Sequence, residues 1–103
     1  MYLIRRVWNV KPGVTKQAAM IIDKIGKAYQ DSGQRSETRV YWSGYTVPGP
    51  ANKVYMDWTQ ETIDSPYREG SSAPNTGDLG AQLRELTEDS YIEFYEMAPE
   101  DRG

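Results

Sequence analysis

The spacing of hydrophobic residues switches repeatedly between two periods, and these switches constrain the fold of the chain more than any other feature. Alternation with a period of two, typical of β-strands, covers residues 2–10, 36–46, 53–59 and 90–97. Residues 14–31 instead place apolar side chains three or four positions apart, which indicates an amphipathic helix. Leu79, Leu83 and Leu86 repeat that spacing and predict a second, shorter helix.

The resulting order is strand, helix, strand, strand, helix, strand. It predicts an α+β fold of the ferredoxin-like βαββαβ type, with a four-stranded antiparallel sheet and two helices on one face. The chain has 103 residues, which is enough for one domain and too little for two. We assign residues 1–98 to that domain and expect residues 99–103 to form a frayed tail.

Composition excludes several classes of function. The chain has no Cys and no His, so it lacks the usual ligands of zinc, haem and iron–sulfur clusters and the commonest general base. We therefore expect no metal and no cofactor. The net charge is −3, which argues against nucleic-acid and membrane-surface partners. No secretory signal or membrane-spanning run is visible, so a cytoplasmic protein is expected.

One charged residue interrupts the apolar face of the first strand. Arg6 shares its parity with Ile4 and Trp8, the parity expected to face the helices. Either Arg6 reaches an edge of the sheet or sits at a bulge, or it anchors an anion or carbonyl in a pocket. On the second interpretation the candidate ligand-binding residues are Arg6, Trp8, Trp42, Trp58 and Tyr67.

Tyr67 belongs to a long segment with few apolar residues. Residues 64–78 contain two Pro, two Gly and three Ser, and Tyr67 is the large apolar side chain among them. A loop of this length in a small domain is usually functional or mobile, so we expect residues 64–76 to be mobile without a ligand, and slower amide exchange with a ligand would indicate a lid.

The opposite parity of the strands is polar but rich in tyrosine. A fully solvated sheet face seldom carries so many phenols beside charges, although Tyr also has a good strand propensity. We interpret the set as the interface of a homodimer, since it would otherwise leave a large apolar-aromatic patch exposed. The candidate interface residues are Arg5, Arg39, Tyr41, Tyr55, Asp57, Glu93 and Tyr95.

Three short motifs resemble those of the dimeric α/β-barrel superfamily, and most closely its antibiotic-biosynthesis-monooxygenase-like branch. They are the Val10-Lys11-Pro12-Gly13 turn before an amphipathic helix, Trp58 at the end of the third strand, and Phe94-Tyr95 in the closing strand. The resemblance implies a homodimer whose two sheets pack face to face into a barrel, with a small-molecule pocket between each sheet and its helices. The haem-ligating His of haem-degrading relatives has no counterpart here.

Two functions follow from these expectations. The resemblance implies a small-molecule-binding protein that could be a cofactor-free oxygenase- or cyclase-like enzyme for an aromatic or polyketide-like compound. The alternative is a non-catalytic dimeric binding or regulatory module, which the lack of His favours.

Overall fold

The computed structural model describes residues 1–33, 35–44, 47–61 and 76–99, and it contains the six expected elements in the expected order. They are β1 (Tyr2–Val10), α1 (Thr15–Asp31), β2 (Arg39–Ser43), β3 (Lys53–Gln60), α2 (Leu79–Leu86) and β4 (Thr87–Glu96). Neither helix in this described part of the chain is long and apolar enough to cross a membrane.

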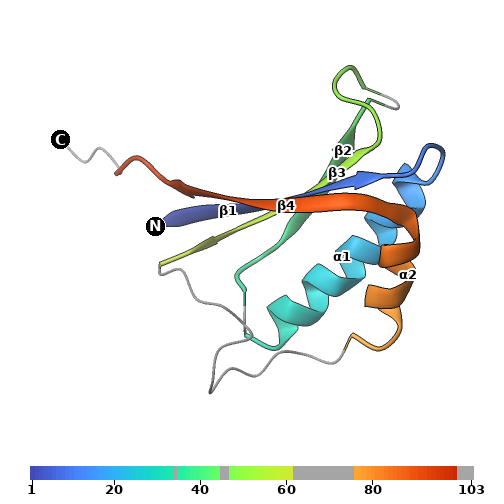
Figure 1. Ribbon diagram of the computed structural model, residues 1–103. Helices are drawn as coiled ribbons and strands as arrows, with labels where there is room; N and C mark the ends of the chain where they lie inside the picture. Colours follow the sequence, from blue (N-terminus) through green and yellow to red (C-terminus); the bar gives the residue numbers. More distant parts are fainter. Residues whose placement is uncertain (34, 45–46, 62–75, 100–103) are drawn as a thin grey trace.

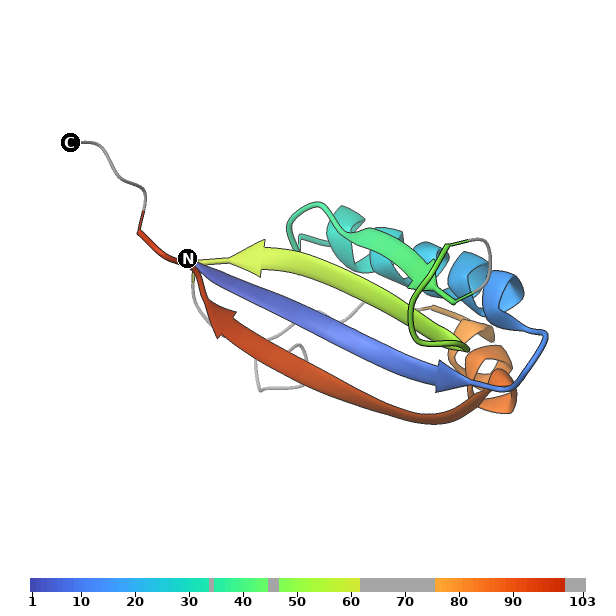
Figure 2. The ribbon, with the colours of Figure 1, turned by 90° about the horizontal axis from the view of Figure 1, so that it is seen from above.

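The strands form a single sheet in the order β2-β3-β1-β4, and every neighbouring pair is antiparallel. Both helices lie on one side of this sheet, and the other side is left open (Figure 1). Viewed from above, β1 and β3 occupy the middle of the sheet, while β2 and β4 form its edges (Figure 2). The ferredoxin-like α+β fold expected from the sequence is therefore confirmed.

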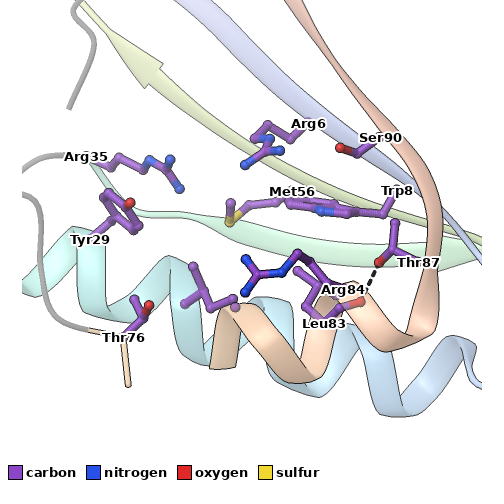
Figure 3. A pocket seen from close by; sticks show the side chains of 12 residues that line it. Arg6, Trp8, Tyr29, Arg35, Met56, Thr76, Leu83, Arg84, Thr87 and Ser90 are labelled. Carbon is purple, nitrogen blue, oxygen red and sulfur yellow. Dashed lines mark hydrogen bonds between the residues drawn. The ribbon is translucent and has the colours of Figure 1, made fainter. Parts of the chain in front are cut away.

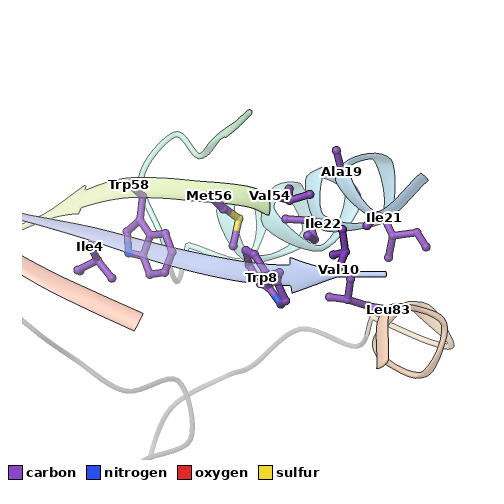
Figure 4. Packing of buried hydrophobic residues seen from close by; sticks show 11 residues of the cluster. Ile4, Trp8, Val10, Ala19, Ile21, Ile22, Val54, Met56, Trp58 and Leu83 are labelled. Carbon is purple, nitrogen blue, oxygen red and sulfur yellow. The ribbon is translucent and has the colours of Figure 1, made fainter. Parts of the chain in front are cut away.

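The hydrophobic core lies between α1 and the two central strands (Figure 4). Alternate residues of β1 and β3 point toward the helix, because successive side chains of a strand project to opposite faces. The buried residues of the cluster are Ile4, Trp8, Val10, Ala18, Ala19, Ile21, Ile22, Val54, Met56, Trp58 and Leu83. Trp42 and Val40 of β2 are only partly buried against it.

Strand boundaries differ from the sequence-based ones at β2 and β4. The strand expected over residues 36–46 is paired only from Arg39 to Ser43, and Ser36 instead donates its hydroxyl to the carbonyl oxygen of Thr59 at 2.6 Å. The last strand begins at Thr87, directly after α2. Its first residues are polar, so their sequence has no alternation from which the early start could be predicted.

Ile92 and Phe94 pair with Arg6 and Ile4 of β1 and so share the helix-facing side of the sheet, but the helices do not bury them. Their side chains are 46% and 49% exposed. The physical reason is that β4 is an edge strand, and α2, with eight residues, lies only beside its beginning (Figure 1). Alternation alone cannot distinguish a covered strand from an edge strand that continues past its helix.

Gly26 lets α1 approach the sheet closely. A Cβ atom added to Gly26 would lie 2.7 Å from Sδ of Met56 and 2.8 Å from Oγ1 of Thr38, whereas one added to Gly80 of α2 would meet only Arg84 Nη1, at 3.8 Å. Alanine favours a helix over glycine by about 1 kcal/mol, but overpacking a core costs roughly 1–3 kcal/mol. We expect Gly26→Ala to lower the free energy of unfolding in urea by about 1 kcal/mol. The matched Gly80→Ala should not lower it, and equal effects of the two would contradict this packing.

Candidate functional site

A pocket of about 270 Å³ opens between the sheet and the two helices (Figure 3). Residues from both central strands, from β4 and from both helices contribute to its walls. The lining residues are Arg6, Trp8, Ile25, Tyr29, Arg35, Met56, Thr76, Gly80, Leu83, Arg84, Thr87 and Ser90. The location is the one that the sequence analysis expected for a small-molecule site.

Arg6 and Trp8 form one side of the pocket from β1. They are two positions apart on the strand, so their side chains project to the same face. The guanidinium carbon of Arg6 lies 4.7 Å from the centre of a Trp8 ring, within the range of a cation–π contact. The register of β1 is regular at Arg6, and the irregularity in its pairing with β4 falls between Asn9 and Val10. A bulge therefore does not explain the charge on this face.

Two further arginines line the same space from other elements. Arg84 reaches it from α2, on the opposite side from Arg6 (Figure 3). Arg35 follows α1, and its guanidinium carbon lies 4.0 Å from the rings of both Tyr29 and Trp58. Arginine stacks well on aromatic rings because its guanidinium is planar and weakly hydrated, so these two contacts orient Arg35.

The pocket lining combines positively charged guanidinium groups with buried apolar side chains. The three guanidinium groups stay protonated at any physiological pH. Trp8, Met56 and Leu83 supply buried apolar surface beneath them. The described lining residues include hydroxyl groups but no carboxylate, and Thr87 donates its hydroxyl to the carbonyl oxygen of Leu83 at 2.7 Å. Such a site complements a flat molecule that carries a negative group, since guanidinium binds carboxylate or phosphate through two parallel hydrogen bonds.

The structure brings some of the predicted ligand-binding residues together and separates others. Arg6 and Trp8 line the pocket. Trp58 lies in the core, where its indole N–H donates to Oε1 of Gln60 at 2.9 Å; it is not among the lining residues, but its ring lies 4.0 Å from the guanidinium carbon of Arg35, which is. Trp42 is partly buried against the core and is not among the lining residues. Tyr67 lies outside the described residues, as does most of the segment over residues 64–78 whose mobility the sequence predicts.

Sequence reasoning missed Arg35 and Arg84. Arg84 follows Leu83 in a short amphipathic helix, where an arginine is ordinarily a solvated residue. Arg35 stands in an irregular segment after α1, and no periodicity there indicates a direction for its side chain. Only the packing of α2 and of this segment against the sheet places both beside Arg6.

The predicted interface residues all lie on the open face of the sheet, in two hydrogen-bonded groups. Arg5 forms an ion pair with Glu93 at 2.7 Å, and Tyr95 donates its hydroxyl to Glu93 at 2.6 Å. In the second group Asp57 accepts hydrogen bonds from Arg39 at 2.8 Å and from Tyr41 at 2.7 Å. The ring of Tyr55 stacks on that of Tyr41, with 5.3 Å between their centres. The open face is therefore already ordered within one chain.

Burial and the neighbouring Asp57 raise the pKa of Tyr41 to about 12. The unfolded chain binds its phenolic proton with the ordinary value of 10.0, so the folded state retains the proton more strongly. The stabilising contribution is complete below pH 10 and is lost as the pH rises toward 12. We expect the free energy of unfolding to fall across this window in the wild type, and to fall less in Tyr41→Phe. Parallel curves for the two proteins, measured by urea unfolding at each pH, would contradict this assignment.

No metal centre is evident in the part of the chain that the structure describes. No three side chains of the His, Cys, Asp or Glu type gather there in a way that could hold an ion. The lining of the pocket consists of arginines, aromatic and aliphatic side chains and hydroxyl groups.

A scan against protein-family models finds no match, and a search of curated proteins finds none either. Solved structures do match. A NIPSNAP family protein from Agrobacterium tumefaciens strain C58 superposes with a TM-score of 0.67 and 19% identity, over 98% of this chain and 94% of that chain. An uncharacterized NIPSNAP domain protein from Burkholderia xenovorans gives 0.61 and 18%, over 95% of each chain. A third structure, another protein from Agrobacterium tumefaciens, gives 0.60 and 17%, over 95% and 94%.

These likenesses establish the fold. The chain shares its ferredoxin-like α+β architecture with NIPSNAP family proteins along almost its whole length. At identities below 20%, they carry no information about ligand or reaction. The antibiotic-biosynthesis-monooxygenase-like branch expected from the sequence motifs stays a prediction.

Proposed function

We propose that this protein binds a small organic anion, of the aromatic carboxylate class, in the pocket between the sheet and the helices. The observation that carries the proposal is the meeting of three arginines from three separate segments, Arg6, Arg35 and Arg84, around one apolar floor. The guanidinium group of an arginine ordinarily extends into water. Three of these groups around one cavity therefore favour a ligand that carries negative charge.

The shape of the site limits the size of the ligand. A volume of about 270 Å³ is at the small end of ligand pockets, which favours a compound with one or two rings. An aromatic ring would pack against the apolar part of the lining, to which Trp8, Met56 and Leu83 belong. The carboxylate would then lie within reach of Arg6 and Arg84, which approach from opposite sides.

The described lining favours binding over catalysis. A cofactor-free oxygenase or cyclase acting on an aromatic or polyketide-like compound needs a group that removes a proton from its substrate. Among the described lining residues, Tyr29 is the one side chain that could act as such a base after losing its own proton, and its ring is already stacked on Arg35. We therefore favour a non-catalytic binding or regulatory module, with the oxygenase-like enzyme as the second candidate.

We also propose that the protein works as a homodimer joined through the open face of the sheet. The supporting observation is the aromatic content of this face: Tyr41, Tyr91 and Tyr95 are 37%, 46% and 43% exposed in the single chain. Exposed aromatic side chains grouped in this way are typical of protein interfaces and uncommon on the surfaces of monomers.

Calorimetric titration with matched acids and amides tests the binding proposal. We expect benzoate, 4-hydroxybenzoate or 2-naphthoate to bind with a measurable dissociation constant, and the corresponding amides to bind at least about tenfold more weakly. The reason is that a charge-assisted hydrogen bond to arginine is roughly twice as strong as a neutral one. Binding of the amides as tight as that of the acids would contradict the proposal, as would no binding of any of them at millimolar concentration.

A further inference from the structure

The helix-facing side of β4 carries apolar side chains that begin at the pocket. Ser90, which lines the pocket, is followed on the same side of the strand by Ile92 and Phe94, because alternate residues of a strand project to one face. The register places Ile92 beside Arg6, the pocket residue of β1, and Phe94 beside Ile4 of the core. Ile92 and Phe94 together form the β4 strip.

The fold leaves the β4 strip uncovered by helices. α2 ends at Leu86, before β4 begins, so it lies only beside the start of the strand (Figure 1). The two side chains of the strip are about half exposed. Scattered single apolar side chains on a surface need no explanation, whereas a contiguous apolar patch beside a cavity is typical of a ligand-binding groove. A ligand that Arg6 holds therefore has apolar surface along which it can extend.

The two ends of the β4 strip carry charges of opposite sign. Arg6 stands at one end, with Arg84 across the pocket. At the other end Glu96, the next residue on this side of β4 after Phe94, pairs with Tyr2 of β1. A ligand that lies along the strip meets positive charge at its head and negative charge at its tail. This order favours a ligand with one acid group and an uncharged tail.

We propose that the ligand of the pocket is an amphipathic acid, an aromatic carboxylate whose hydrocarbon tail leaves the pocket and lies on the β4 strip. The inference rests on the proposed function and adds to it the part of the ligand that lies outside the pocket. Two residues of an antiparallel strand span about 7 Å, which matches about five or six carbons of an extended alkyl chain.

The register also determines from which ring position the tail leaves. The strip runs past Arg6 and away from Trp8, since Ser90 pairs with Trp8 and Ile92 with Arg6. With the carboxylate at Arg6 and the ring packed toward Trp8, the tail must leave the ring on the side of the carboxylate. That is position 2 of a benzoate. A tail at position 4 points toward the Trp8 end of the pocket and away from the strip.

Titration calorimetry with two isomeric series of alkylbenzoates tests this geometry. A fully buried methylene strengthens binding about three- to fourfold, and a chain that lies on a strip buries one side, so we expect about twofold per carbon. The dissociation constant of 2-pentylbenzoate should then be about 30-fold lower than that of benzoate, and that of 4-pentylbenzoate less than about threefold lower. The two isomers are equally hydrophobic, so non-specific adsorption would affect both alike.

Variants of the strip provide a second test of the same contact. Neither Ile92 nor Phe94 is among the lining residues, so Ile92→Ser/Phe94→Ser should leave the dissociation constant of benzoate unchanged. It should reduce the gain of 2-pentylbenzoate to about threefold or less, because the tail then lies on polar side chains. Ile92→Leu/Phe94→Leu keeps the surface apolar and should keep most of the gain. The comparison of isomers on the wild type needs no variant, so the test does not depend on how the serine variant folds.

The possible results separate this inference from the proposed function. Binding of benzoate with equal gains in both series, or with no gain in the 2-series, overturns the inference and leaves the proposed function standing. Failure of all the acids to bind overturns both.

A diacid tests the direction of the tail. The tail of 2-(4-carboxybutyl)benzoate ends in a second carboxylate, which the proposed pose brings toward Glu96. We expect it to bind at least about tenfold more weakly than 2-pentylbenzoate, since like charges brought together cost free energy. Equal affinities of the diacid and 2-pentylbenzoate would contradict this direction.

Discussion

Replacing Arg6 and Arg84 together by glutamine is expected to weaken the binding of aromatic carboxylates by at least about 100-fold. A hydrogen bond to a charged group is worth about 1.5–3 kcal/mol, and each 1.4 kcal/mol is a factor of about ten in the dissociation constant. The two residues reach the pocket from β1 and α2, so each single variant should give about half of the effect in free energy. The amides, which lack the charge, should lose much less.

Matched variants distinguish this effect from a general loss of structure. Arg39→Gln removes an exposed arginine from the opposite face of the sheet and should leave the dissociation constant unchanged. Arg84→Lys keeps the charge but lacks the planar fork, so its binding should fall between that of the wild type and that of Arg84→Gln. A double glutamine variant with the affinity of the wild type would show that the arginines do not recognise the ligand.

Placing a carboxylate at Tyr91, on the open face of the sheet, is expected to weaken the proposed dimer. Tyr91 is 46% exposed in the single chain, so Tyr91→Asp should leave the monomer fold intact, but it places a charge beside Lys53, whose Nζ lies 5.7 Å from the centre of the Tyr91 ring, in the interface when two faces meet. Burying a polar or charged group that is only partly compensated costs about 1–3 kcal/mol, which corresponds to an increase of about tenfold or more in the dimer dissociation constant. Sedimentation velocity should then show a species near the chain mass of 11.7 kDa.

The control for this variant is Met20→Asp. Met20 is 58% exposed, and it belongs to α1, on the other side of the sheet from the open face that carries Tyr91. Met20→Asp should leave the sedimentation coefficient of the protein at its wild-type value. If both variants dissociate the dimer, the added charge acts through net charge or fold stability and not through the open face. If neither variant dissociates it, the open face is not the dimer interface.

The sequence predicted the fold well because the fold depends on local periodicity. The apolar residues of β1, α1 and β3 keep their period through each element, and together they supply all but one of the buried residues of the core cluster. Ile92 and Phe94 show the limit of this reasoning. Their alternation is as regular as that of β1, but their burial depends on whether a helix lies over them, and the spacing of residues within a strand has no information on that.

The sequence predicted some residues of the candidate site and not others, because only some of them interrupt a local pattern. Arg6 could be found because it breaks an apolar pattern, so its position carries a local signal. Arg35 and Arg84 break no pattern, and they reach the pocket only through the packing of an irregular segment and of a short helix. Trp42 and Trp58 share the parity of Trp8, but parity specifies a face of the sheet and not a position along it. They therefore lie on the expected face and away from the pocket lining.

Side-chain NMR of the arginines tests the central claim, anion recognition in the pocket, most directly. The Nε–H resonances of Arg6, Arg84 and Arg39 can be assigned by single substitution and followed during titration with 4-hydroxybenzoate or 2-naphthoate. The account predicts saturable shifts for Arg6 and Arg84 with a common dissociation constant, no shift for Arg39 on the open face, and little response to the matched amides. Unchanged Arg6 and Arg84 signals at millimolar acid, or equal shifts in all three, would contradict it.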